Sequence, residues 1–154
     1  MRRSRRWTDL ARDEGSASLE FLTVGLLLLV PTVYLVIALS ALQNAAFGIE
    51  GAARQASRVF VQAESVAAAE AAAARAIEAT LDDYGVDPSA VEITITCRPA
   101  PSACLTRRGF VTVRLDTVVP LPGLPSVLGI DLPAGMPVSA TSTEQVSRFA
   151  GVRE

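Results

Sequence analysis

The feature that most limits how this chain can fold is an uninterrupted apolar run, Phe21 to Leu42, which contains no charged residue. As an α-helix it would be about 33 Å long, close to the thickness of a bilayer's hydrocarbon core. A buried core helix and a secretory signal peptide are the alternatives. The rest of the 154-residue chain could hardly surround so long a helix, and the apolar part of a signal peptide is shorter, about 7–15 residues. The sequence therefore predicts a single membrane span.

Charge sets the expected orientation of this span. Five arginines precede it: Arg2, Arg3, Arg5, Arg6 and Arg12. Basic flanks are retained in the cytoplasm, so residues after about Asn44 are expected on the other side of the cytoplasmic (inner) membrane. The same distribution argues against nucleic-acid binding, which needs a cationic face on a folded domain.

The composition also restricts the chemistry of the chain. It contains no histidine and no lysine, so the usual near-neutral proton shuttle and the commonest transition-metal ligand are missing. Serine and acidic residues are present, but no spacing joins them into a recognised catalytic set. We expect no catalytic residues, no metal site and no cofactor.

The junction before the apolar run is the most informative stretch. It contains Gly15, then small residues, then Glu20 and Phe21 at the start of the apolar helix. A carboxylate at the centre of a bilayer costs about 2.5 kcal/mol or more, so an acid near that depth usually has a partner or a purpose. The simpler alternative is that Glu20 reaches back to the headgroups beside the positive end of the helix.

This pattern of Gly15, Glu20 and Phe21, behind a basic leader and before a long apolar helix, resembles the type III signal of type IV pilin-like proteins. In that superfamily a prepilin peptidase cuts after the glycine, so the resemblance implies cleavage between Gly15 and Ser16. The family's glutamate pairs with the N-terminal amine of a neighbouring subunit. The resemblance gives this assembly role to Glu20, paired with the amine of Ser16.

Within that superfamily the chain is most similar to the TadE-like minor pilins and pseudopilins of tight-adherence (Flp-type) pilus systems. The likeness includes the short leader, the single span and the alanine- and arginine-containing segment 51–58. It departs from the family pattern in the acidic Asp13 and Glu14 beside the proposed cut. Major Flp pilins have tyrosine after the glutamate and are much shorter, so the resemblance implies a minor subunit. Its implied partners are the prepilin peptidase, other pilin-like subunits, the pilus-assembly membrane complex and the lipid bilayer.

The expected organisation is a leader at 1–15, a transmembrane helix at 16–44, an extracytoplasmic helical region at 45–85 and a small β-rich domain at 86–154. Glu50 and Arg54, spaced i, i+4, favour continuation of the first helix. Residues 62–84 are alanine-rich and predict a second helix, ended by Gly85 and followed by an Asp87–Pro88 turn. Its expected apolar face is formed by Val66, Ala69, Ala73, Ile77, Leu81 and Tyr84.

Beyond residue 90 the apolar period changes to two. Alternation predicts strands at 91–97 and 111–116 and, less clearly, at 138–145. The intervening stretch contains Pro120, Pro122, Pro125, Pro133 and Pro137, which predicts a long loop because proline donates no ladder hydrogen bond. The fold class is therefore α+β: a long N-terminal helix, then a small antiparallel sheet packed on a helix.

Cys97 and Cys104 flank six residues at the expected turn between the first two strands. In an oxidising compartment a disulfide is the natural interpretation, and closing this loop would contribute about 2–3 kcal/mol. A zinc site or a reactive thiol lacks further ligands or a histidine base. Arg107 and Arg108 beside it form either a solvated turn or a small contact patch.

Two functions follow from these observations. The leading hypothesis is a cleaved minor pilin or pseudopilin whose chemistry is assembly. The alternative is an uncleaved, membrane-anchored binding module of the cell envelope in which Gly15 and Glu20 are coincidental. An extracytoplasmic enzyme is a third class, and the chain shows no catalytic constellation for it.

Overall fold

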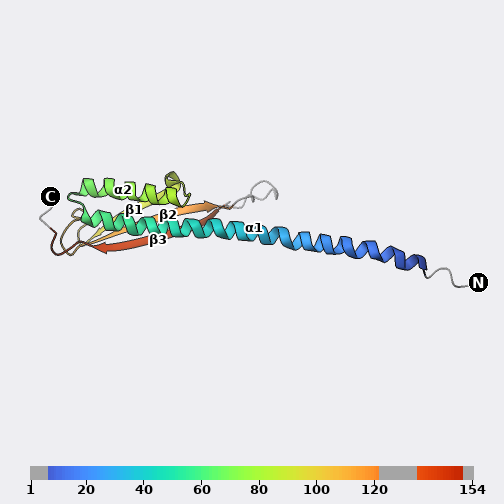
Figure 1. The fold of residues 1–154 in the computed structure, drawn as a ribbon. Helices are drawn as coiled ribbons and strands as arrows, with labels where there is room; N and C mark the ends of the chain where they lie inside the picture. Colours follow the sequence, from blue (N-terminus) through green and yellow to red (C-terminus); the bar gives the residue numbers. More distant parts are fainter. Residues whose placement is uncertain (1–6, 122–134, 151–154) are drawn as a thin grey trace, which may run out of the picture. The chain divides into compact units, whose positions relative to one another are not determined.

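The computed structural model describes residues 7–121 and 135–150, with side chains from residue 17 onward. The fold is α+β, as expected, with the element order α1, α2, a short 3-10 turn, β1, β2 and β3 (Figure 1). The chain divides into two compact units, Met1–Leu39 and Ser40–Glu154. The second unit contains the sheet, α2 and the last part of α1.

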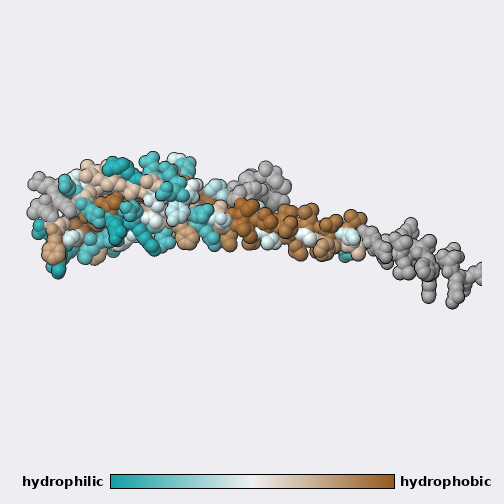
Figure 2. Space-filling view, in the orientation of Figure 1, coloured by the Kyte–Doolittle hydropathy of each residue, from teal (hydrophilic) through white to brown (hydrophobic). Residues whose placement is uncertain are grey.

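Helix α1 is a single helix from Trp7 to Gln62, with Pro31 inside it. In its apolar part Phe21 and the leucine, isoleucine and valine side chains from Leu19 to Leu39 are exposed, Tyr34 is partly buried, and no residue of its most apolar window is buried. Thr23 and Thr32 each donate their hydroxyl to the carbonyl four residues earlier, at 2.7 Å, which satisfies these polar groups within the helix. By length and composition the helix can cross a membrane. Figure 2 shows the apolar surface along this stretch.

From Ala45 onward one face of α1 is buried. Its buried residues recur every three or four positions, as on a helix that packs on one side. They are Ala45, Gly48, Ile49, Ala52, Ala53, Ala56, Ser57 and Phe60. On the exposed face Glu50 and Arg54 form the expected i, i+4 ion pair. The prediction that the helix continues beyond the apolar run is confirmed.

Helix α2 runs from Val66 to Asp83. Ser65 caps its N-terminus by accepting a hydrogen bond from the Ala68 N–H, at 3.3 Å. The buried stripe is Ala69, Ala73, Ile77 and Leu81, as the spacing predicts. Gly85 takes a left-handed φ of 67°, and the N–H of Val86 reaches the Leu81 carbonyl, so the expected glycine cap is also confirmed.

The predicted buried stripe of α2 is wrong at its last residue. Tyr84 is 45% exposed. The regular helix ends at Asp83, and Tyr84 takes the non-helical C-cap conformation. The first atoms of its side chain still lie against Gly48 of α1, so only part of the side chain is covered. The expected turn follows as a 3-10 turn, Pro88–Ala90, capped by Asp87.

The sheet has three antiparallel strands in the order β1-β2-β3. The strands are β1 Val91–Arg98, β2 Phe110–Pro120 and β3 Gly135–Gln145. Residues of the central strand alternate: Val111, Val113 and Leu115 are fully buried, whereas the residues between them lie on the open face. The buried side chains form one cluster with those of α1 and α2, so both helices cover the same face of the sheet.

The expected proline-rich loop is shorter than predicted. Pro120 is the last residue of β2, and Pro137 lies in β3 opposite Val118. Proline is tolerated at a strand end and on an edge strand, where its missing N–H breaks no ladder between inner strands, and β3 is an edge of this sheet. Pro122, Pro125 and Pro133 lie outside the described residues.

Candidate functional site

The junction of the proposed processing signal lies within α1. The backbone is helical at Gly15 and Ser16, whose side chains lie outside the described part of the chain. Glu20 is exposed, and Phe21 is 78% exposed. Among the described residues no ion pair involves Glu20. Its carboxylate is thus exposed on the surface of the helix.

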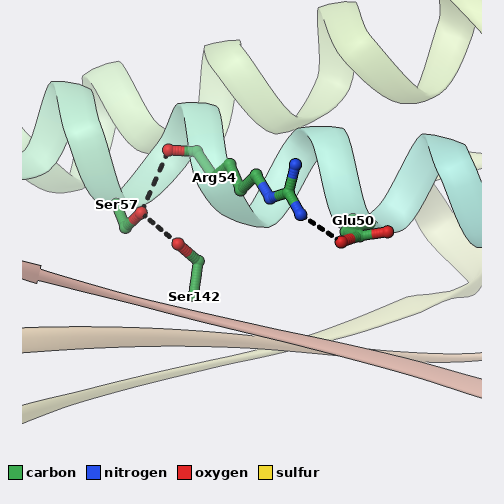
Figure 3. Close-up of polar contacts among 4 residues, drawn as sticks. All are labelled: Glu50, Arg54, Ser57 and Ser142. Atoms are coloured by element: carbon green, nitrogen blue, oxygen red, sulfur yellow. Dashed lines mark hydrogen bonds and ion pairs between the residues drawn. The ribbon is translucent and has the colours of Figure 1, made fainter.

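The contact between α1 and β3 is partly polar. Ser57 is fully buried, and its hydroxyl lies 2.9 Å from that of Ser142 and donates to the Arg54 carbonyl at 3.0 Å. Figure 3 shows that Ser57 points toward the sheet while Arg54 and Glu50 pair along the helix. These contacts set the position of α1 on the sheet. The exposed ion pair leaves the opposite face of the helix polar.

Cys97 and Cys104 form a disulfide in the connection between β1 and β2, with their Cα atoms 5.0 Å apart. The predicted bond is therefore confirmed. Cys97 is buried in the core cluster and Cys104 packs against it. The disulfide thus anchors the connection, which also contains a cis peptide bond before Pro99, to the interior of the unit.

Four exposed arginines lie at this end of the unit, and we call them the arginine end: Arg98, Arg107, Arg108 and Arg148. Hydrogen bonds hold the backbone of this surface in place. The N–H of Arg108 donates to the Val146 carbonyl at 3.1 Å, and the N–H of Val146 donates to Gly109 at 2.9 Å. Arg107 Nε donates to the Ala150 carbonyl at 2.7 Å. The connection and the segment after β3 therefore form one surface.

Two features of the arginine end are unusual for a solvated turn. Arg108 has a φ of 61°, a left-handed conformation that is uncommon for residues other than glycine. The Phe149 ring is 81% exposed, with the guanidinium carbon of Arg148 4.6 Å from its centroid, a cation–π arrangement. The sequence predicts the Arg107–Arg108 pair but not its association with Arg98 and Arg148, because residue spacing cannot show that the segment after β3 returns to the hairpin.

The other end of the unit, where β1 begins and α2 ends, is acidic. Its exposed carboxylates are Asp82, Asp83, Asp87 and Glu92. The nearby Arg114 is already bound, since its Nε and Nη2 donate to the two carboxylate oxygens of Asp116 at 2.7 Å. This contact lowers the pKa of Asp116 and raises that of Arg114.

Asp87 is fixed by its neighbour. Its Oδ1 accepts hydrogen bonds from the hydroxyl and the N–H of Ser89, at 2.7 and 2.9 Å, and these bonds lower the pKa of Asp87. The carboxylate is therefore charged at neutral pH. It borders a hollow of about 580 Å³ that is also lined by Ala41, Ala45, Tyr84 and Val119, among others.

In the described part of the chain, no group of three or more His, Cys, Asp or Glu side chains is placed to hold a metal ion. Comparison with protein-family models, with curated proteins and with solved structures found no match to this chain.

Proposed function

We propose that this chain is a minor pilin- or pseudopilin-like structural subunit for tight-adherence pilus assembly. A prepilin peptidase removes residues 1–15, the apolar part of α1 holds the subunit in the cytoplasmic (inner) membrane, and the folded unit lies outside the cytoplasm. The N-terminal helix then packs against other pilin-like subunits in the pilus or its assembly complex.

The observation that carries this proposal is the exposure of the apolar part of α1. Its phenylalanine, leucine, isoleucine and valine side chains are 48–78% exposed between Leu19 and Leu39. An apolar surface of this extent is not stable in water and marks a surface for lipid or for another protein. The apolar surface of a pilin-like helix contacts lipid while the subunit is in the bilayer and contacts neighbouring helices after assembly.

The residues before this helix fit processing and assembly. Glycine is a weak helix former, about 1 kcal/mol less favourable than alanine, so Gly15 locally weakens the start of α1. Cleavage there would place a new amine at Ser16. In a low-dielectric helix bundle that amine would supply the opposite charge that Glu20 lacks in a single copy.

The disulfide supports the proposed location of the folded unit. Bonds of this kind form and persist in oxidising compartments and are rare in the cytosol. The arginines before the apolar run favour the same orientation.

An uncleaved, membrane-anchored binding module is the second candidate. It is favoured by the folded unit itself, which has a contiguous core of its own formed by two helices and one sheet face. In that case the apolar helix is only an anchor, and Gly15 and Glu20 have no role.

Substitution of Glu20 tests the assembly role. The Glu20→Ala variant should insert into the membrane as the wild type does, because its helix remains apolar, but should be poorly recruited to pili. Glu50→Ala is the matched control, since it removes another exposed α1 carboxylate whose surface ion pair contributes little. Pilus preparations probed for the subunit measure recruitment. Normal recruitment of Glu20→Ala would contradict the pairing role.

A further inference from the structure

The two ends of the Ser40–Glu154 unit carry opposite charge. β1 alone separates Glu92 from Arg98 by about 20 Å, and Figure 1 shows that the β1–β2 connection and the start of α2 lie at the end of the unit opposite the end of α2. One end presents the arginine end, whose four arginines outnumber the exposed carboxylates of Glu64 and Glu144 at the same end, and the other presents Asp82, Asp83, Asp87 and Glu92. The two ends are therefore complementary in charge.

Local structure does not account for either set of charges. Asp82 and Asp83 lie in the last turn of α2, which has no basic residue, although the C-terminus of a helix favours cations. Arg108 occupies a left-handed conformation that would suit glycine better. The backbone at Arg108 is thus in a sparsely populated conformation of the kind that clusters at functional sites.

Shape complements charge at these two ends. Phe149 is, among the residues whose side chains the structure describes, the most exposed large hydrophobic outside the apolar part of α1, at 81%. The hollow at the acidic end has a volume of about 580 Å³, ample for an aromatic ring, and is lined largely by apolar side chains beside Asp87. The hollow is thus large enough to receive an exposed ring, and one carboxylate, that of Asp87, lines it.

We propose that the arginine end of one copy docks on the acidic end of a second copy, with Phe149 in the hollow. The contact is heterologous, because the two surfaces differ, and contacts of this kind extend into open chains when their rotation does not close a ring. A long polyanion fits less well, because the acidic remainder of the unit would repel it beyond the four arginines. The inference rests on the proposed function for its setting and specifies a subunit contact within it.

Charge reversal in the full chain, purified in mild detergent, tests the contact. One variant combines Arg98→Glu with Arg148→Glu, and the other combines Asp82→Arg with Asp83→Arg. Each variant alone should self-associate about tenfold or more weakly than the wild type, whereas their mixture should recover association. Raising the salt from about 0.1 M to about 1 M should weaken wild-type association, because the screening length falls from about 10 Å to about 3 Å.

The absence of lysine from the chain permits a second readout. An Arg148→Lys variant carries the only side-chain amine, which a carbodiimide can join directly to a carboxylate. In a mixture of isotope-labelled and unlabelled copies, mass spectrometry should find this lysine joined to Asp82, Asp83, Asp87 or Glu92 of the other copy. Arg54→Lys is the control, and its link should be to Glu50 of the same copy.

Several results would overturn the proposal. Wild-type self-association of either reversed variant, or failure of the mixture to recover it, excludes contact between these two ends. Intermolecular links from position 148 to other carboxylates only would show a different contact. Binding of the arginine-end surface to anionic lipid vesicles or acidic polysaccharide, without self-association, would assign the surface to that ligand instead. Because the uncleaved chain is used, failure of cleavage or of recruitment to pili does not affect these outcomes.

Discussion

At the scale of single residues, Gly48 and Gly51 lie one turn apart on α1 but leave different room for a side chain. A Cβ at Gly48 would lie 2.9 Å from Tyr84 Cβ, whereas one at Gly51 would meet Thr80 Cγ2 at 3.5 Å, an ordinary contact. Gly48→Ala should lower the free energy of unfolding by about 1–3 kcal/mol, because the close contact forces the backbones apart. Gly51→Ala should leave it unchanged or raise it by about 0.5–1 kcal/mol. Denaturant unfolding compares the two, and equal effects would contradict this packing.

Asp87 gives a pH-dependent prediction at the same scale. Its two hydrogen bonds from Ser89 lower its pKa in the folded state below the ordinary value of 3.8. Its contribution to stability is therefore fully present above that value and is lost as pH falls through the lower, folded-state pKa. Ser89→Ala should raise the pKa of Asp87 toward 3.8, measured by NMR titration of its carboxyl group. Asp116, held by Arg114, is the control and should not change. An unaltered Asp87 titration would show that Ser89 is not the cause.

At the scale of elements, the disulfide anchors the connection between β1 and β2. Replacing both cysteines, Cys97→Ala with Cys104→Ala, should lower the free energy of unfolding by about 2–3 kcal/mol, because the unfolded chain regains the freedom of that loop. Denaturant unfolding of the oxidised wild type and the double variant measures this change. Equal stability would mean that the hydrogen bonds between this connection and the segment after β3 suffice to hold it.

The elements themselves follow closely from local pattern. The buried stripe of α2 and the alternation along β1 and β2 are periodic signals that need no knowledge of distant residues. The predictions are wrong at three residues. Tyr84 is the cap residue, where the helical period ends. Pro120 and Pro137 lie in strands, because a strand end and an edge strand tolerate proline. Contacts between elements were not predictable in the same way. Ser57 and Ser142 are 85 residues apart, and nothing in either neighbourhood indicates their hydrogen bond.

At the scale of the whole molecule, the apolar part of α1 and the folded unit differ in their surfaces, one apolar and the other charged. The apolar part of α1 has exposed side chains that need contact with lipid or with another protein. The folded unit presents opposite charge at its two ends. The sequence predicts the first property because it lies in one continuous run. The second depends on Arg98, Arg148 and residues of α2 that come together only in the folded unit.

The same division explains how much of the candidate site the sequence predicts. The junction from Gly15 to Phe21 and the pair Cys97 and Cys104 are contiguous or nearly so, and both are visible as motifs. The arginine end is assembled from a hairpin connection and a later segment, so only its Arg107–Arg108 part could be recognised. The proposal that this chain is a cleaved, pilin-like subunit depends on the junction from Gly15 to Phe21.

Mass spectrometry of the N-terminus tests that claim most directly, using protein isolated from its native membrane. Cleavage after Gly15 predicts a mature chain that begins at Ser16. The Gly15→Val variant should remain uncut, because a branched side chain replaces the glycine at the cleavage position. A mature wild-type protein that begins at Met1 would contradict the pilin-like account and favour the uncleaved membrane-anchored module.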